Sequence, residues 1–150
     1  MRLLHVDRLD FTEFQDDQRP PYVAASHRWL SSRETTFQDV RDWRNTNGGG
    51  YQKVKAVAAY VREHLAPIKW LWVDTCCINK DSAAELSEAI NSMFDWYQEA
   101  ELCLAYLADV EMAGDGSSFE MSKWFKRGWT LQELLAPRMV LFVTKEWHAA

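Results

Sequence analysis

The chain has little of what marks several classes of protein. Its 150 residues include only 6 Gly, 4 Pro and 3 Cys, which excludes collagen-like and low-complexity chains. No apolar run approaches the roughly 20 residues that cross a bilayer. The 17 Lys and Arg against 22 Asp and Glu leave a net charge of −5, so the chain lacks the basic surface that general nucleic-acid binding requires. We therefore expect neither a nucleic-acid partner nor a membrane segment.

The cysteines indicate a reducing environment. Cys76 and Cys77 are adjacent and Cys103 stands alone, and neighbouring residues of a strand point to opposite faces, so a disulfide framework is not expected. The amino terminus is charged from Arg2 onward, too early for a signal peptide. We expect buried, reduced thiols and a cytoplasmic protein.

The length and composition of the chain predict one soluble domain over residues 1–150. Hydrophobic residues make up 47% and charged residues 26% of the chain, an ordinary balance for a domain with a real core. Tryptophan is unusual, because 8 of the 150 residues supply more large aromatic surface than a core of this size needs.

Short apolar runs alternate with stripes at helical spacing. The predicted strands cover residues 22–26, 68–73, 102–107 and 139–143. The predicted helices cover residues 54–65, 86–97 and 122–135, and residues 3–14 are expected to add an edge strand. This β-α-β-α-β-α-β order predicts an α/β fold, a mainly parallel sheet with helices on both faces in three layers.

Ligands of such sheets bind beyond the carboxyl ends of the strands. Ser26, His27, Arg28 and Trp29 follow the first predicted strand. A guanidinium can hold a diphosphate or carboxylate, and an indole can stack on a flat heterocycle, so these residues form half of a nucleotide site. The alternative is structural: Arg28 pairs with a nearby carboxylate and Trp29 fills the interior edge.

Two acids are further candidates. Asp74 ends an apolar strand, where a carboxylate is costly unless it is paired or working; it could equally cap the next turn through Thr75 or pair with Arg28. Glu133 lies on the last predicted helix, one turn from Trp129 and away from its apolar stripe, so it faces solvent or a cleft. Thr130 and Glu133 also fit a capping box, which would make Glu133 structural.

The spacing of residues does not support a zinc site, a glycine-rich nucleotide loop or a serine nucleophile. His27, His148 and the three cysteines lack the intervals of a structural zinc site, and we expect no metal. No glycine-rich dinucleotide or phosphate-binding loop follows a strand. Ser26 and His27 are adjacent on a strand and diverge, so they are not a nucleophile and its base.

Four blocks resemble the heterokaryon-incompatibility (HET) domain of filamentous fungi and together span about residues 1–147. They are YVAASHRW at 22–29, WLWVDTCCIN at 70–79, ELSEAINSMF at 85–94 and RGWTLQELLAPR at 127–138. The chain departs from the usual pattern at Ala25, Leu30 and Lys80, where the family has Leu, Gly and Gln. Leu30 matters most, because Gly can take a positive φ that Leu resists.

The resemblance implies a function. HET domains trigger regulated cell death when genetically different fungal cells fuse, and they are regarded as relatives of TIR domains, which have a flavodoxin-like sheet. Many TIR domains hydrolyse NAD⁺ with a glutamate in a Ser-x-Trp…Glu-Leu pattern. Ser122 and Trp124 precede Glu133 here, with a longer spacer than the TIR form.

Glu133 thereby becomes the catalytic candidate and NAD⁺ the expected substrate rather than a prosthetic group. Arg28 would hold the diphosphate, Trp29 or Trp129 would stack on a base, and Asp74 would orient the ribose or Arg28. Ser26 and His27 complete the expected binding residues.

Two functions stay open. One is an NAD⁺-hydrolysing effector that works when it self-associates as a homo-oligomer. The other is a non-enzymatic signalling module that recruits fungal incompatibility partner proteins, and a domain that keeps only the fold is a third possibility. Family members usually carry this domain at the front of a longer chain, so we expect residues 1–150 to be the N-terminal part of one.

Overall fold

A computed structural model describes residues 1–31, 33–112, 114 and 116–150. Six strands form one sheet in the order β2-β1-β4-β3-β5-β6. Their bounds are β1 Arg2–His5, β2 Phe11–Glu13, β3 Tyr22–His27, β4 Trp70–Val73, β5 Leu102–Leu107 and β6 Val140–Thr144. All four strands predicted for the parallel sheet are therefore present, with ends that differ by at most two residues.

The last four strands are parallel to one another. β3 pairs with β4 on one side and β5 on the other, and β5 pairs with β6. Numbered among themselves along the chain, these four strands have the order 2-1-3-4, which also occurs in flavodoxin-like sheets. The connection from β3 and the connection from β5 run in opposite directions, so the carboxyl ends of these two strands mark a switch point where ligands commonly bind.

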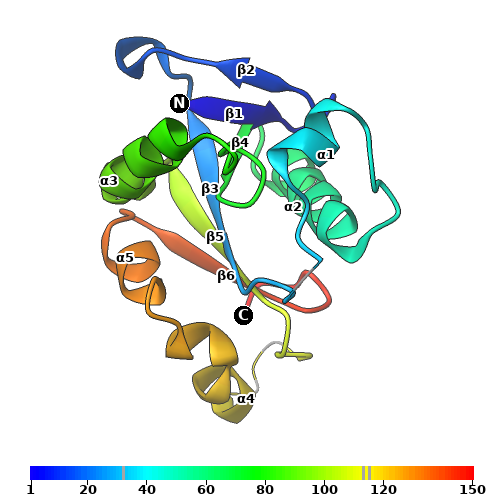
Figure 1. The fold of residues 1–150 in the computed structure, drawn as a ribbon. Coiled ribbons are helices and arrows are strands. Elements are labelled where there is room, and N and C mark those ends of the chain that lie inside the picture. Colours follow the sequence, from blue (N-terminus) through cyan, green and yellow to red (C-terminus); the bar gives the residue numbers. More distant parts are fainter. Residues whose placement is uncertain (32, 113, 115) are drawn as a thin grey trace.

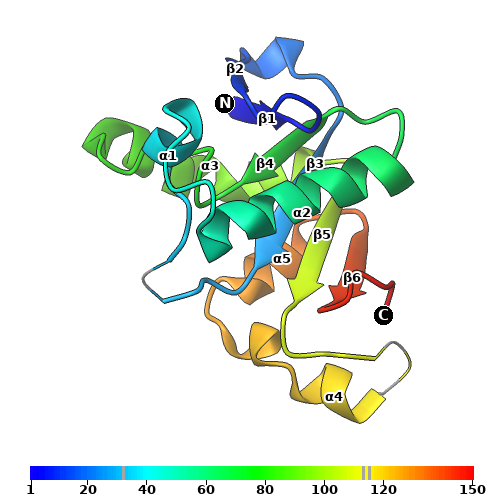
Figure 2. The ribbon, with the colours of Figure 1, turned by 90° about the vertical axis from the view of Figure 1, so that its right-hand side faces the viewer.

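Helices cover both faces of the sheet, as predicted (Figure 1). Short α1 (Phe37–Arg41) and long α2 (Gly49–His64) lie on one face, and α3 (Ala83–Glu99) and α5 (Thr130–Leu135) lie on the other. Figure 2 shows α2 running across β3, β4 and β5. The remaining helical turns are η1 Asp16–Gln18, α4 Gly116–Met121 and η2 Lys123–Lys126.

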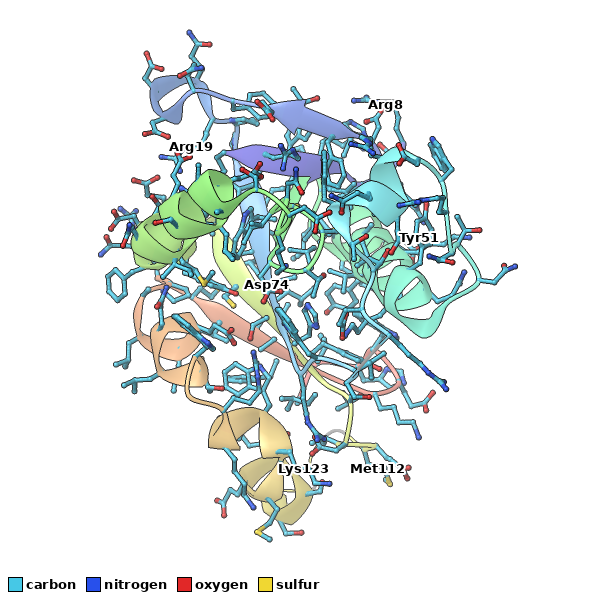
Figure 3. The ribbon with its side chains drawn as sticks, in the orientation of Figure 1. Arg8, Arg19, Tyr51, Asp74, Met112 and Lys123 are labelled. Carbon is cyan, nitrogen blue, oxygen red and sulfur yellow. The ribbon has the colours of Figure 1, made fainter. Side chains whose placement is uncertain are left out.

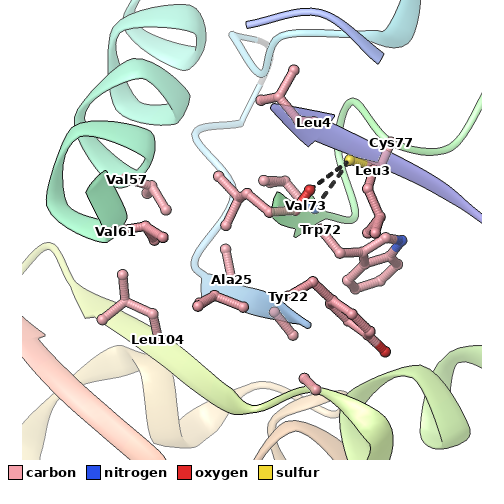
Figure 4. Packing of buried hydrophobic residues seen from close by; sticks show 14 of the residues in the cluster. Leu3, Leu4, Tyr22, Ala25, Val57, Val61, Trp72, Val73, Cys77 and Leu104 are labelled. Carbon is pink, nitrogen blue, oxygen red and sulfur yellow. Dashed lines mark hydrogen bonds between the residues drawn. The ribbon is translucent and has the colours of Figure 1, made fainter. Parts of the chain in front are cut away.

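Alternation along the strands produces two apolar layers. Val57 and Val61 of α2 point toward Leu104 of β5 on one side of the sheet (Figure 4). On the other side Trp72 of β4 makes edge contacts with Trp96 and Tyr97 of α3, at ring-centroid distances of 5.6 and 5.3 Å. These side chains are almost wholly buried, so part of the tryptophan excess is ordinary core. The three cysteines are free and buried, as predicted.

The expected edge strand over residues 3–14 is a two-stranded hairpin instead. β1 pairs antiparallel with β2 and also with β4, so the sheet is mixed rather than purely parallel. The apolar residues Leu3 and Leu4 are fully buried, because β1 lies inside the sheet and β2 takes the edge position.

The prediction of one last helix over residues 122–135 is wrong. The chain forms η2, interrupts the helix at residues 127–129 and restarts as α5. Gly128 weakens the helix at this point, and η2 and α5 pack against different parts of the protein. Trp124 enters a small core with Phe119, Phe125 and Phe142, whereas α5 lies against α3. Leu131 and Leu135 are consequently exposed at 64% and 66%, so they share no buried stripe with Trp124.

Close packing holds the loop that follows β3 against α2. A Cβ on Gly50 would lie 2.3 Å from the Arg33 carbonyl oxygen and 2.4 Å from the Thr35 nitrogen, so glycine is required for this approach. Lys53 of α2 donates to Glu34 at 2.6 Å, and both side chains are buried. The loop that carries Trp29 is therefore fixed at its far end.

Candidate functional site

A pocket of about 470 Å³ lies at the carboxyl ends of β3 and β4, between α3 and α5. Its lining consists of Trp29, Asp74, Ile78, Lys80, Leu86, Ile90, Met93, Arg127, Gly128, Trp129 and Glu133. Figure 3 shows Asp74 near the middle of the molecule, whereas Arg8 and Met112 lie at its periphery. The pocket thus combines an apolar wall from α3 with two carboxylates, two cations and two indoles, a composition typical of a ligand site.

Glu133 is the most buried charged group of the pocket, with 3% of its surface exposed. Ser26 Oγ donates to its Oε2 atom. Arg127 donates to both carboxyl oxygens, Nη1 to Oε2 at 3.2 Å and Nη2 to Oε1 at 3.4 Å. The protein therefore occupies Oε2 with two donors and leaves Oε1 with one longer contact, so Oε1 is the better placed to accept from a ligand hydroxyl.

Burial raises the pKa of Glu133 above its ordinary value. The negative charge of Asp74 acts in the same direction, while Arg127 and the Ser26 hydroxyl oppose the shift without cancelling it. A carboxyl group whose pKa is raised by desolvation beside a specific cation, inside a pocket, is a typical feature of functional sites.

Asp74 is held by its neighbours on both oxygens. His27 Nε2 lies 3.2 Å from Oδ1, and Trp29 Nε1 donates to Oδ2 at 2.9 Å. Burial alone would raise the pKa of Asp74, but His27, Lys80 and Trp29 together hold it below its ordinary value. The two structural alternatives for Asp74, a cap on the next turn through Thr75 and a pair with Arg28, are wrong. Among the described residues, the partners of its carboxylate are His27 and Trp29.

Trp29 stands at the mouth of the pocket with 44% of its surface exposed, so it does not fill the interior. Lys80 lies over its ring, with Nζ 5.1 Å from the ring centroid, and Lys80 also donates to the Asp74 carbonyl oxygen at 2.5 Å. Leu30, which stands where the family usually has Gly, does not take a positive φ, so its side chain causes no backbone strain at this position.

The structure brings some of the predicted residues to the pocket and not others. Asp74, Trp29, Trp129 and Glu133 line it, and Trp129 is 52% exposed. The buried side chains of Ser26 and His27 lie behind it, where they contact the two carboxylates. Arg28 is exposed and does not belong to the lining.

The capping-box alternative for Glu133 is also wrong. Trp129, not Thr130, is the N-cap residue of α5. The Thr130 hydroxyl donates to the Trp124 carbonyl oxygen at 2.6 Å, so it links α5 to η2. Glu133 is therefore free to interact with Ser26 and Arg127.

Sequence reasoning missed the two cations of the pocket. Arg127 belongs to the break between η2 and α5, which the prediction of a continuous helix concealed. Lys80 lies in the loop after Asp74 and was noticed only as a departure from the family pattern. Gly128 was the available indication that the helix opens there, because glycine weakens a helix interior.

Two further findings concern the described residues. Among residues 1–31, 33–112, 114 and 116–150, no three His, Cys, Asp or Glu side chains group as metal ligands. Within the same ranges, no helix has the length and apolar character needed to span a membrane.

Sheet order and pocket together define a doubly wound α/β domain with an aromatic-lined candidate site at the carboxyl ends of its strands. The chain belongs to the heterokaryon incompatibility protein (HET) family, which it matches over residues 22–118.

A curated relative is similar over most of this chain. The vegetative incompatibility protein HET-E-1 of Podospora anserina is 44% identical over 136 residues, which cover 85% of this chain and 10% of the relative. The chain thus spans about a tenth of the length of the curated relative that it matches. No solved structure matches the chain.

Proposed function

We propose that this domain is an effector of fungal non-self recognition and regulated cell death, and that it hydrolyses NAD⁺ at the nicotinamide–ribose bond when it is self-associated. The observation that supports the enzyme most is Glu133, a buried carboxyl group that lines a pocket with two cations and two indoles. Membership of the HET family supports the cellular role.

The chemistry needs few groups. Water adds to the anomeric carbon of the ribose, the bond to nicotinamide breaks, and the products are ADP-ribose, neutral nicotinamide and a proton. Because the leaving group is a neutral pyridine, no general acid has to protonate it. The transition state is oxocarbenium-like, so a carboxylate beside the ribose stabilises the developing positive charge. Glu133 takes this role, with Oε1 accepting from a ribose hydroxyl.

The other pocket residues bind the rest of the substrate. Lys80 and Arg127 would neutralise the diphosphate, in place of Arg28, which does not line the pocket. Trp29 and Trp129 are exposed indoles on the pocket and would stack on the base rings. Asp74 acts through Trp29, whose indole N–H it accepts, and therefore positions the stacking surface.

The relation to TIR domains is part of the proposal. It is supported by the 2-1-3-4 order of the parallel strands and by the position of Glu133 on the crossover that follows the third parallel strand. The TIR-like reaction and the need for clustering both follow from this relation.

The test is nicotinamide release from NAD⁺ by the domain fused to an oligomerising scaffold. We expect release by the wild type and a loss of about 100-fold to 1,000-fold in Glu133→Gln, the size of effect that follows removal of one transition-state stabiliser. Glu85→Gln is the matched control, because Glu85 also pairs with an arginine but lies outside the pocket. No release by the clustered wild type, or equal release by Glu133→Gln, refutes the enzyme.

One observation favours the non-enzymatic alternative. Ile90 and Phe94 of α3 and Leu131 and Leu135 of α5 are each at least 46% exposed, which is unusual for large apolar side chains on neighbouring helices and suits recruitment of a partner protein. If cell death in a fungal host survives Glu133→Gln but is lost in Leu131→Glu, recruitment is the function. The opposite pattern supports hydrolysis.

A further inference from the structure

A buried chain of hydrogen bonds leads from η2 through β3 to Glu133. Trp124 Nε1 donates to Ser26 Oγ at 2.8 Å, and Ser26 Oγ donates to Glu133 Oε2. The three side chains are exposed by only 1%, 1% and 3%, and Ser26 is 98 residues from Trp124 and 107 from Glu133. The hydrogen bonds therefore link three separate elements, η2, β3 and α5.

The direction of this chain is determined by its first member. An indole N–H can only donate, so Ser26 Oγ must be the acceptor of that bond. The single hydroxyl proton of Ser26 is then available to Glu133, and Oε2 accepts it in the structure. Arg127 also has only donors to offer, so every polar side chain in contact with Glu133 at hydrogen-bond distance favours a carboxylate.

We propose that Ser26 and Trp124 are positioning residues, which hold Glu133 as an ionised carboxylate with Oε1 turned to the pocket. This inference rests on the proposed function of Glu133. It also changes the expected role of Ser26, because a hydroxyl group engaged on both sides and 1% exposed supports the catalytic group rather than the substrate.

Trp124 is itself immobilised. Its backbone N–H donates to Ser122 Oγ at 3.2 Å and its carbonyl oxygen accepts from Thr130. Its ring makes edge contacts with Phe125 and Phe142, at centroid distances of 5.0 and 5.4 Å. Packing therefore determines the direction of the indole N–H, and this N–H in turn orients the Ser26 hydroxyl that accepts from it.

The titratable groups around Glu133 are few. Arg127 lowers the pKa of Glu133 and Asp74 raises it. Tyr97 of α3 and Cys103 of β5 also lie within range of its charge, and burial holds the pKa of each well above its ordinary value, so both are neutral near pH 7. The hydroxyl of Ser26 is then the main uncharged group that favours ionisation.

The experiment follows the carboxyl carbon of Glu133 by NMR during a pH titration, with the resonance identified by its loss in Glu133→Gln. In Ser26→Ala and in Trp124→Phe we expect the pKa of Glu133 to rise by about one. In the NAD⁺ assay kcat at pH 7 should fall about tenfold with KM within about twofold, and the acid limb of the pH profile should move upward. Ser26→Thr retains the hydroxyl and should restore the wild-type pKa.

Trp72→Phe is the matched control, because it shortens a fully buried indole elsewhere in the core. It should leave the Glu133 titration and kcat unchanged after correction for stability. An unchanged pKa in Ser26→Ala, or a rise in KM at constant kcat, overturns the positioning role. If the clustered wild type releases no nicotinamide, the proposed function fails, and the NMR titration still decides whether Ser26 and Trp124 control Glu133.

Discussion

Two arginine–glutamate pairs involve α3 and α5, the helices on one face of the sheet, and the pKa of the glutamate is shifted in opposite directions in the two pairs. Arg2 of β1 pairs with Glu85 of α3 at 2.5 Å, and Arg127 pairs with Glu133 of α5 at 3.2 Å. Burial would raise the pKa of Glu85, but hydrogen bonds from Arg2 and the Asn79 N–H hold it below its ordinary value. At Glu133 burial prevails and the pKa is raised.

The difference comes from solvent and from the number of partners. The Glu85 side chain is 30% exposed and that of Glu133 only 3%. Arg2 also donates to Glu13 and to the Cys77 carbonyl oxygen, so its pair joins the hairpin to α3. Arg127 donates to Glu133 through two long contacts and lines the pocket. The first pair joins two elements of the fold, whereas the second places a costly buried charge on the wall of the pocket.

The largest effect on stability is expected from Arg2→Ala. The guanidinium lies over the Phe37 ring at 4.1 Å and is only 11% exposed, so its removal takes away packing and several charge-assisted hydrogen bonds at once. We expect the free energy of unfolding to fall by about 2 kcal/mol, measured by urea denaturation.

Glu13→Gln is the control for Arg2. Glu13 is 73% exposed, and such a surface partner is worth less than about 1 kcal/mol. NAD⁺ cleavage should be unaffected in both variants once they are folded. A loss of activity in folded Arg2→Ala would show that the two pairs are not functionally separate.

A smaller effect, of the opposite kind, is expected from Arg127→Gln. In the proposed function Arg127 binds the substrate diphosphate, so KM for NAD⁺ should rise about tenfold in this variant. The free energy of unfolding should change by only about 1 kcal/mol, because Glu133 can take up a proton once its cation is gone. The measurement is a steady-state titration with NAD⁺ beside a urea melt.

Lys126→Gln removes the same charge one residue earlier. Lys126 is exposed on η2 and does not line the pocket, so its KM should match the wild type. Equal KM values in the Arg127 and Lys126 variants would remove Arg127 from the binding site.

The smallest effect is a difference in the sign of pH dependence. Folding lowers the pKa of Glu85 from 4.5, so its contribution to stability is present above that pH and is lost as pH falls through the folded pKa. Folding raises the pKa of Glu133 from 4.5, so its contribution is present below that pH and is lost as pH rises through the raised pKa.

Thermal melts of the two glutamine variants test these signs. Between about pH 3 and pH 7, Glu85→Gln should lose stability relative to the wild type as pH rises, and Glu133→Gln should gain it. Two curves of the same slope would mean that folding shifts the pKa of both glutamates in the same direction.

Much of the fold was predictable because it depends on local patterns. The apolar runs of β3, β4, β5 and β6 and the stripes of α2 and α3 were recognisable from periodicity alone. Ser82 caps α3 by accepting from the Glu85 N–H, and serine is a common residue at that position. The break between η2 and α5 was not predictable from periodicity, because Trp124 follows a separate aromatic core rather than the stripe of α5.

The candidate site was predictable only in outline. Asp74 and Trp29 were found because residues that follow parallel strands meet at one edge of the sheet. Their mutual hydrogen bond was not expected, and Arg28 was given the role that Lys80 and Arg127 are better placed to fill. Residue type and strand position do not determine the direction in which an exposed arginine extends.

The sequence by itself determined the α/β architecture, the family and the short set of acids worth testing, because hydrophobic periodicity and motif blocks are properties of neighbouring residues. Only the tertiary structure decided that Glu133 is buried, that Ser26 supports it and that Arg127 pairs with it. Desolvation and hydrogen bonding depend on groups from distant parts of the chain, and the 107 residues between Ser26 and Glu133 place this contact beyond any local pattern.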